Sequence, residues 1–335
     1  MKDEQLNLRK TMDFALKFKG SEEEISKIFD LYKLKVLDVQ CFKNGIINTS
    51  YCLKTEDGSK LVLRVYQSGD KSNDAIEKEL DFMDEMRKSG VPIPSIIVNI
   101  FDRKLTVFKD SVGKEWRVVV ITFARGRHLE PTDFEIIPEF AMYQAKMHLV
   151  SSGLNKNSEG SNFKAMVDWM DKEFNEIKSK GLIKEIFGKI EEIYNELKQN
   201  IESSFEEILA LPYGDVHLDY DSDNVIIDNG KIKAILDFDD ISRQPFILDT
   251  ANSIWWWLLK NKKEDYEKIL NSYFESYREI RNIAEKEYKF LSLFLRMRNL
   301  TLMCLLCVNI SEGINYLRIN EGLILDSSSN AFLSF

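Results

Sequence analysis

The segment that most constrains this chain is Tyr213–Asp240, which reads YGDVHLDYDSDNVIIDNGKIKAILDFDD. It contains two short apolar runs, Val225–Ile227 and Lys231–Leu236, with Asp-Asn-Gly at positions 228–230 between them. Asn-Gly supplies the positive φ angles of a tight hairpin turn, and β-branched residues favour strands. The segment therefore predicts a two-stranded hairpin whose open end brings together the acidic residues on either side of it.

Oxygen-bearing side chains flank this hairpin. Asp219 and Asn224 precede the first strand, and Asp237 follows the second. Carboxylate and amide oxygens are ligands that suit Mg²⁺ carrying phosphates. From His217 to Asn224 the spacing His-x-Asp-x₄-Asn is that of the kinase catalytic loop, in which the Asp takes the proton of the attacking hydroxyl and the Asn holds a metal. We predict Asp219 as the catalytic residue, with Asn224 and Asp237 as metal ligands.

These residues resemble the aminoglycoside phosphotransferase and choline kinase family of small-molecule kinases, whose loop usually reads HGD followed by Asn. This chain has Leu218 in place of the glycine, a departure that leaves the oxygen ligands intact and affects the local backbone. The resemblance implies an α+β, two-lobed protein-kinase-like fold with a small antiparallel β-sheet N-lobe and a larger, mostly helical C-lobe. It also implies ATP or GTP as co-substrate and Mg²⁺ as cofactor.

Other interpretations of the acidic residues are weaker. Gly214 and Asp215 supply a Gly-Asp pair in another frame, but they leave the Asn too far downstream. An EF-hand fails because its position 6 would be Asn224 and its position 12 would be Gly230, where Gly and Glu are required. The remaining acids of the segment read as solvated loop residues: Asp215, Asp221, Asp223 and Asp228.

Before this segment the pattern predicts a small sheet and a helix. Strands are expected at Val36–Phe42, Thr49–Lys54 and Lys60–Tyr66, and a helix at about Ser72–Ser89. Further strands are expected near residues 95–100, 104–109 and 115–122.

Arg64 lies on the third strand, where kinases place a lysine. A cation flanked by apolar residues is costly unless an anion meets it, and Glu79 of the following helix matches the family best as its partner. The resemblance implies that this pair directs the guanidinium toward the nucleotide phosphates. It also implies that the loop with Gly45 and Asn48 covers the triphosphate, although for this loop taken alone an ordinary hairpin is the better interpretation.

Strand patterns nearly vanish between residue 125 and residue 225, which predicts a domain boundary. The resemblance makes Thr122, Phe123 and Ala124 the hinge whose backbone groups bind adenine. We expect an N-terminal helical segment at 1–35 with a capping box at Ser21, a nucleotide-binding N-lobe at 36–124, and a helical C-lobe at 125–335 that holds the catalytic loop and the substrate site.

Three features of the C-lobe bear on the site. His148 reads as a hydrogen-bonded core histidine, and Asp249 resembles the family's DxA aspartate, which braces the catalytic loop. The helix that Asp249 begins carries Trp255, Trp256 and Trp257, whose rings point about 100° apart. At least one ring belongs in the core, and another is available for a cation–π contact with a cationic substrate.

Composition limits the possible partners. The net charge is −9, with 46 basic and 55 acidic residues, which disfavours nucleic acid and anionic membranes and suits a cationic substrate. The most apolar late stretch, residues 290–310, is interrupted by Arg296, Arg298 and Asn299, so no membrane span is expected. The first 20 residues carry charges throughout, so we expect no secretory signal, reduced cysteines and a cytoplasmic location.

Together these patterns and the family resemblance predict an ATP-dependent, or GTP-dependent, phosphotransferase that moves the γ-phosphate to a hydroxyl of a small cationic molecule, aminoglycoside-like or an amino alcohol. A homoserine- or sugar-type metabolite kinase is an alternative. A protein kinase is disfavoured because the residues between Asp237 and Asp249 leave no room for an activation loop. A non-enzyme alternative, a nucleotide-binding regulatory module of the same fold, conflicts with the retention of Asp219, Asn224 and Asp237.

Overall fold

The structure is a computed structural model that describes residues 22–42, 48–67, 69, 71–154, 161–179 and 184–309. The expected capping residue Ser21 and the loop residue Gly45 lie outside these ranges. The chain divides into two compact units, Met1–Gly126 with Lys233–Leu236, and Arg127–Ile232 with Asp237–Phe335. The first unit therefore ends just beyond Ala124, and it also takes in a short piece of the hairpin.

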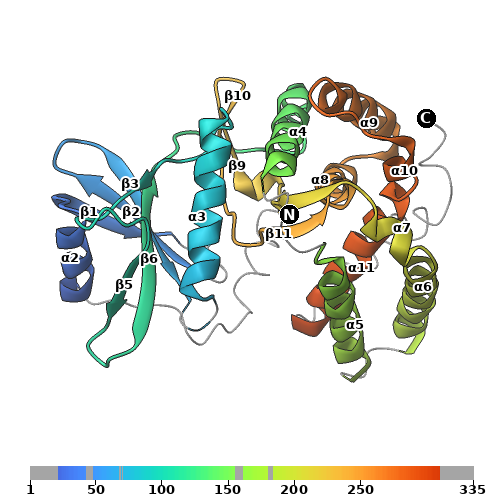
Figure 1. Cartoon of the computed structure of the whole chain (residues 1–335), viewed down its shortest axis with the longest axis horizontal. Helices are drawn as coiled ribbons and strands as arrows, with labels where there is room; N and C mark the ends of the chain where they lie inside the picture. The colour runs from blue at the N-terminus through green and yellow to red at the C-terminus, as the bar shows by residue number, and fades with distance from the viewer. Residues whose placement is uncertain are drawn as a thin grey trace. The chain divides into compact units, whose positions relative to one another are not determined.

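The first unit combines an antiparallel sheet with two helices (Figure 1). Its elements are α2 (Glu22–Leu31), β1 (Val36–Cys41), β2 (Thr49–Thr55), β3 (Lys60–Tyr66), α3 (Asn73–Lys88), β4 (Ile96–Ile97), β5 (Thr106–Lys109) and β6 (Glu115–Thr122). The strand order is β1-β2-β3-β6-β4, and β5 pairs with β6. The helix and the other predicted strands are therefore present at nearly the expected bounds, but the strand expected near residues 95–100 is reduced to the two residues of β4.

Alternation along the strands gives this sheet two different faces. Leu63 on β3 pairs with Val120 on β6, and both are buried together with Ile28 of α2 in one hydrophobic cluster. Tyr66 lies one residue beyond buried Val65, so its side chain points to the other face, where its hydroxyl donates to Glu79 of α3. Helices α2 and α3 thus cover opposite faces, as Figure 1 shows.

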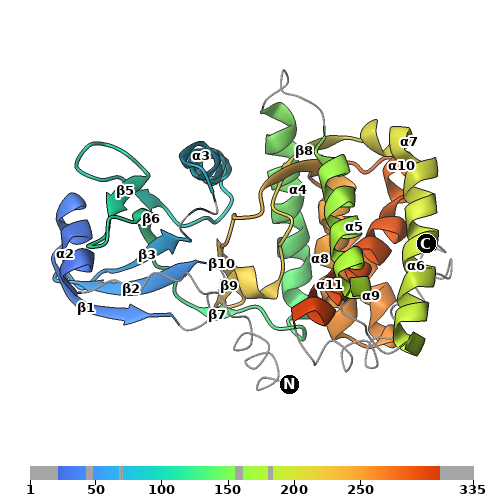
Figure 2. The ribbon, with the colours of Figure 1, turned by 90° about the horizontal axis from the view of Figure 1, so that it is seen from below.

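The second unit is mostly helical. Its helices are α4 (Ile137–Gly153), α5 (Phe163–Ser179), α6 (Lys184–Ser203), α7 (Phe205–Leu209), α8 (Phe246–Lys260), α9 (Lys263–Arg278), α10 (Glu285–Tyr288) and α11 (Leu291–Asn309), with 3₁₀ turns η1 (Phe134–Ile136) and η2 (Ser222–Asn224). Its strands are β7 (Arg127–His128), β8 (Tyr213–Val216), β9 (Val225–Asp228), β10 (Lys231–Ile235) and β11 (Ser242–Pro245). Helix α11 packs against α5, α6 and α8, and Figure 2 shows α5, α6 and α11 side by side.

The predicted hairpin forms between β9 and β10, in a sheet of order β10-β9-β7. Asn229 and Gly230 have φ angles of 51° and 68°, as the tight turn requires. A second, unpredicted ladder joins β8 to β11, with Val216 opposite Ser242 and Tyr213 opposite Pro245. This ladder ties the segment before the hairpin to the segment after it.

Helix α8 is buried along most of its length. Trp255, Trp256 and Trp257 are all at most 6% exposed, so all three rings belong to the core and none is left on the surface for a substrate.

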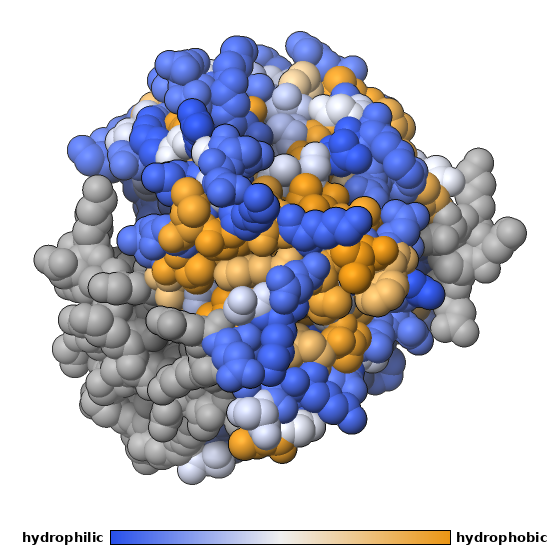
Figure 3. Space-filling model, turned by 90° about the vertical axis from the view of Figure 1, so that its left-hand side faces the viewer, coloured by the Kyte–Doolittle hydropathy of each residue, from blue (hydrophilic) through white to orange (hydrophobic). Residues whose placement is uncertain are grey.

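The surface of the first unit carries exposed hydrophobic side chains, among them Leu37, Ile100, Phe101 and Val112. Figure 3 shows hydrophobic side chains gathered across one face, between hydrophilic ones. Within the described ranges, no helix combines the length and the apolar character needed to cross a bilayer.

Candidate active site

Asp219 and Asn224 contact each other directly at the entrance to β9. The 3₁₀ turn η2 places the Asn224 side chain so that its Nδ2 donates to the Asp219 carbonyl oxygen at 2.8 Å and to Asp219 Oδ2 at 3.0 Å. Because the amide nitrogen makes both of these bonds, the Asn224 Oδ1 remains outside them. That oxygen is the atom a hard cation would take.

The two ends of the hairpin meet in the structure. The ring of His217, two residues before Asp219, lies 4.5 Å from the ring of Phe238, the residue after Asp237. Both rings are buried, whereas Asp237 is exposed and adopts a left-handed backbone with φ 62°. The ring contact holds the segments that carry Asp219 and Asp237 side by side.

Leu218 shows what the missing glycine costs. Its φ is +64°, a left-handed conformation that is strained by about 1 kcal/mol for a residue with a Cβ. Two side chains of α8 hold it there: its N–H donates to Asp249 Oδ1 at 2.6 Å, and its carbonyl accepts from Asn252 Nδ2 at 3.1 Å. Ser253 adds a third contact, through a 2.8 Å hydrogen bond to the Tyr220 carbonyl.

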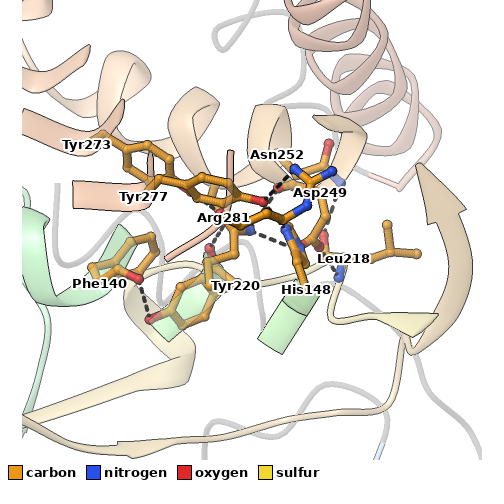
Figure 4. Close-up of polar contacts among 11 residues, drawn as sticks. Phe140, His148, Leu218, Tyr220, Asp249, Asn252, Tyr273, Tyr277 and Arg281 are labelled. Atoms are coloured by element: carbon orange, nitrogen blue, oxygen red, sulfur yellow. Dashed lines mark hydrogen bonds and ion pairs between the residues drawn. The ribbon is translucent and has the colours of Figure 1, made fainter. Parts of the chain in front are cut away.

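Asp249 ends a buried chain of hydrogen bonds that begins at Arg281 (Figure 4). Its Oδ2 lies 2.8 Å from His148 Nε2, and His148 Nδ1 lies 2.6 Å from the Tyr277 hydroxyl. The Tyr277 oxygen accepts from Arg281 Nη1 at 3.2 Å, and Arg281 pairs with Glu287 at 2.6 Å. The predicted core histidine and the predicted bracing aspartate are thus confirmed as parts of one network.

The surroundings of this network set its protonation. Burial lowers the pKa of His148 below its ordinary value, so the imidazole is neutral. Burial alone would raise the pKa of the Asp249 carboxyl, but the hydrogen bonds from His148 and from the Leu218 N–H outweigh it and leave that pKa below its ordinary value. An ionised Asp249 only accepts hydrogen bonds, so His148 donates from Nε2 and accepts the Tyr277 proton at Nδ1.

Arg298 of α11 is a site residue that sequence reasoning missed. Its Nη2 lies 2.9 Å from Asp219 Oδ1, and its guanidinium carbon lies 5.8 Å from the centre of the Trp255 ring. The signal available in the sequence was an arginine inside a strongly apolar helix, because burying a charge is costly unless an opposite charge pairs with it. The cation beside Trp255 is therefore supplied by the chain itself.

The other acids of the segment differ from one another. Asp223 is exposed and Asp221 is half-buried, and burial next to Asp219 and Asp223 raises the pKa of the Asp221 carboxyl well above its ordinary range. Asp215 corrects the solvated-loop prediction, because it is only 4% exposed and belongs to β8. Strand β8 is buried on both faces. A four-residue strand of this kind shows no alternation of polar and apolar residues, so the sequence did not reveal it.

Packing explains why a glycine stands at position 214, the first residue of the Gly-Asp pair that was rejected as the catalytic motif. A Cβ at this position would lie 2.5 Å from Ser151 Oγ and 2.9 Å from the Phe246 ring. The glycine therefore lets β8 lie close against α4 and α8.

In the first unit, Glu79 is the anchor of a polar cluster. It is 3% exposed, it accepts from the Tyr66 hydroxyl at 2.8 Å, and it pairs with Lys71 at 3.0 Å. The Arg64 guanidinium carbon lies 5.4 Å from the centre of the Tyr66 ring, which places Arg64 at the same cluster. The Arg64–Glu79 pair stays a prediction, and Lys71 is a cationic partner of Glu79 that the sequence did not point to.

The remaining predicted nucleotide residues make contacts within the first unit. Asn48 Oδ1 accepts from the Gln67 N–H at 2.9 Å. Thr122 Oγ1 accepts from the Ser95 N–H at 2.9 Å, and the Phe123 N–H donates to the Lys60 carbonyl at 3.3 Å. The roles predicted for Asn48, Thr122, Phe123 and Ala124 in binding a nucleotide stay predictions.

Comparisons with known proteins identify the family and the fold. The model of the phosphotransferase enzyme family matches residues 38–283. A homoserine kinase of Methylobacillus flagellatus is 23% identical over 262 residues, covering 78% of this chain and 76% of that protein.

Two solved structures share the fold. An amicoumacin kinase in complex with AMP-PNP, Ca²⁺ and its ligand aligns with a TM-score of 0.72 at 16% identity, over 97% of this chain and 96% of that one. A microcompartment-associated aminopropanol kinase aligns with a TM-score of 0.73 at 17% identity, over 92% of this chain and 99% of that one. The predicted two-lobed, protein-kinase-like α+β fold is thereby confirmed. The chain belongs to the phosphotransferase enzyme family, as a kinase of small molecules.

Proposed function

We propose that this protein transfers the γ-phosphate of ATP to a hydroxyl group of a small molecule, with Asp219 as the general base. The observation that carries the proposal is the contact between the two hairpin ends, the His217 and Phe238 rings 4.5 Å apart, because it holds the segments of Asp219 and Asp237 together. A loop that merely exposed its acids to solvent would need no such contact.

In the proposed reaction the acceptor hydroxyl binds at Asp219, which takes its proton as the oxygen attacks the γ-phosphorus. A bond forms from that oxygen to the phosphorus, the bond to the bridging oxygen of ATP breaks, and ADP leaves. Asn224 holds Asp219 in place through its two hydrogen bonds. Positioning of this kind supplies most of the rate in phosphoryl transfer.

Asn224 and Asp237 fit a divalent cation. The Asn224 Oδ1 is outside the bonds to Asp219, and Asp237 is an exposed carboxylate, so both offer hard oxygen ligands of the kind Mg²⁺ prefers. When bound, Mg²⁺ would neutralise charge on the phosphate oxygens.

We assign nucleotide binding to the first unit. Arg64 contacts the phosphates and Glu79 orients it, with Gly45 and Asn48 at the phosphate loop and Thr122, Phe123 and Ala124 at the adenine. Lys71 joins this group through its ion pair with Glu79. ATP is the preferred co-substrate, and AMP-PNP in the amicoumacin kinase complex supports an adenine nucleotide. The described cysteines are free thiols, which is typical of a reducing compartment, so we place the enzyme in the cytoplasm.

Two acceptor classes have support. The acids around Asp219 suit a cationic amino alcohol or an aminoglycoside, and an aminopropanol kinase shares the fold. Homoserine, a hydroxy amino acid, is the acceptor of five similar proteins, all of them homoserine kinases.

The test is an acceptor screen with the purified protein. Aminoglycosides, amino alcohols, homoserine and sugars are each incubated with MgATP or MgGTP, and release of the nucleoside diphosphate is compared with an acceptor-free blank. We expect acceptor-dependent release with at least one class and a phosphorylated product by mass spectrometry. Metal-dependent nucleotide binding without any phosphorylated acceptor would contradict the proposal and favour a regulatory module.

A further inference from the structure

Arg298 places a positive charge beside the carboxylate that accepts the proton. Its Nη2 lies 2.9 Å from Asp219 Oδ1, while Asn224 occupies Oδ2 of the same carboxylate. An acceptor hydroxyl must come within about 3 Å of an Asp219 oxygen to lose its proton. Whatever part of the acceptor adjoins that hydroxyl therefore meets the guanidinium.

The position of this guanidinium is fixed by its neighbours. Trp255 lies beside it at 5.8 Å, within the range of a cation–π contact. The Trp255 indole N–H in turn donates to Asn299, the next residue of α11, at 3.3 Å. The arginine thus lies against a buried, hydrogen-bonded aromatic side chain before any ligand arrives.

The guanidinium also has donors to spare. It has five N–H groups, and within the described part of the chain its one hydrogen bond is the contact with Asp219; its Nε has no partner there. The Arg298 side chain is 24% exposed and that of Asp219 is 36% exposed. Such a half-open ion pair is weak and can be displaced, so a second carboxylate can compete for the arginine.

Charge separates the two acceptor classes. A purely cationic acceptor would bring its ammonium group next to Arg298, and like charges at close range repel. A carboxylate is attracted, and the planar guanidinium can bind both of its oxygens. The exposed carboxylate of Asp223, on the same loop, would attract an ammonium group on the same molecule.

We propose that Arg298 is a specificity-determining residue that binds a carboxylate of the acceptor, so that the substrate is a hydroxy acid, in particular a zwitterionic hydroxy amino acid. The contact lengths limit the hydroxyl oxygen and the carboxylate of such an acceptor to a separation of at most about 9 Å. Homoserine satisfies this limit. This inference rests on the proposed function and narrows its acceptor.

The test compares acceptors that differ only in the carboxylate. Homoserine, its carboxamide and 3-aminopropan-1-ol all keep the hydroxyl and the ammonium group. With the wild-type enzyme and MgATP we expect kcat/KM for homoserine to exceed that for the other two by about 10- to 100-fold, the range of a charged hydrogen bond. Arg298→Met should remove most of this ratio, mainly by raising KM for homoserine, and Arg298→Lys should restore part of it.

A matched control lies on the same helix. Arg296 pairs with Glu196 at 2.9 Å, away from Asp219, so Arg296→Met should keep the wild-type ratio. Circular dichroism establishes that each variant is folded. A wild-type enzyme with equal kcat/KM for the three acceptors, or an Arg298→Met variant with an unchanged ratio, would overturn the role of Arg298 and leave the phosphotransferase function standing.

If none of the three acceptors is phosphorylated, a binding measurement tests whether Arg298 recognises the carboxylate. Calorimetric titration of homoserine and its carboxamide into the protein loaded with MgAMP-PNP reports recognition without transfer. We expect the same preference for the carboxylate in the wild type and its loss in Arg298→Met. Equal binding of the two compounds by the wild type would overturn the inference, whatever the fate of the proposed reaction.

Discussion

Asp219 and Asp249 are two carboxylates at the same loop with opposite surroundings. The Asp249 side chain is 1% exposed and accepts hydrogen bonds from Gln144, His148 and the Leu218 backbone. The Asp219 side chain is 36% exposed and meets only Asn224 and Arg298 among the described residues. The comparison teaches that one carboxylate holds the loop in shape, whereas the other is left accessible for chemistry.

Replacing Asp219 should have the largest effect, and on turnover alone. Asp219→Asn keeps the shape of the side chain but cannot accept a proton, so we expect kcat to fall by about 10²- to 10⁴-fold. AMP-PNP binding by calorimetry and the melting temperature should stay near wild type, because the residue is half exposed. An Asp219→Asn variant with wild-type kcat would remove this residue from its role.

Replacing Asp249 should give the reverse pattern. Asp249→Asn turns one acceptor into a donor facing the His148 N–H or the Leu218 N–H, and we expect a loss of about 2–4 kcal/mol in the free energy of unfolding. Chemical denaturation measures it. Asp228→Asn in the hairpin is the matched control, with an expected change below about 0.5 kcal/mol. If both variants unfold alike, Asp249 does not brace the loop.

Gly214→Ala tests the close packing of β8 against α8, the helix that carries Asp249. The added Cβ would meet Ser151 Oγ at 2.5 Å and the Phe246 ring at 2.9 Å, and overpacking of this kind costs about 1–3 kcal/mol. Gly188→Ala in α6 is the control, because nothing lies within 4 Å of its Cβ and alanine favours a helix by about 0.5–1 kcal/mol. Opposite changes in melting temperature are expected, and equal changes would contradict the close approach of β8.

The pH dependence of stability gives the smallest effect. Burial lowers the pKa of His148 below its ordinary value of 6.5, so below that pH the unfolded chain binds a proton that the folded protein does not. The contribution of this group to the free energy of unfolding should therefore be fully present above about pH 6.5. Below that pH it should decrease by at most about 1.4 kcal/mol per pH unit. The lowered pKa of Asp249 adds a loss only below about pH 3.8.

His148→Gln isolates that contribution. It removes the titrating group, so the decrease in unfolding free energy between pH 7 and pH 5 should become shallower than in the wild type. Denaturation curves across that interval measure the slope. An identical slope in the variant would mean that His148 is not the titrating group.

Local patterns predicted one part of the molecule well. The hairpin and its Asn229 turn follow from alternation and turn chemistry within Tyr213–Asp240. The spacing in the same segment singles out Asp219, Asn224 and Asp237, whose roles stay predictions. Helix α3 likewise begins after its capping residue Ser72, whose side chain accepts from the Ala75 N–H.

Contacts between distant segments could not be predicted in the same way. The β8–β11 ladder joins two four-residue strands, one with a buried aspartate and the other ending in proline, so neither carries a strand pattern. Arg298 reaches Asp219 from 79 residues away, and nothing in local periodicity specifies which helix packs against a loop. Its only sequence signal was a charge in an apolar helix.

The most direct test of the account is the location of a divalent ion. Crystals grown with Mn²⁺ and AMP-PNP would show the metal by anomalous scattering. We predict a peak within about 2–2.3 Å of both Asn224 Oδ1 and an Asp237 oxygen, beside Asp219. A metal bound instead by Asp221 and Asp223, with Asn224 and Asp237 too far apart to share it, would contradict the assignment of the hairpin as the catalytic centre.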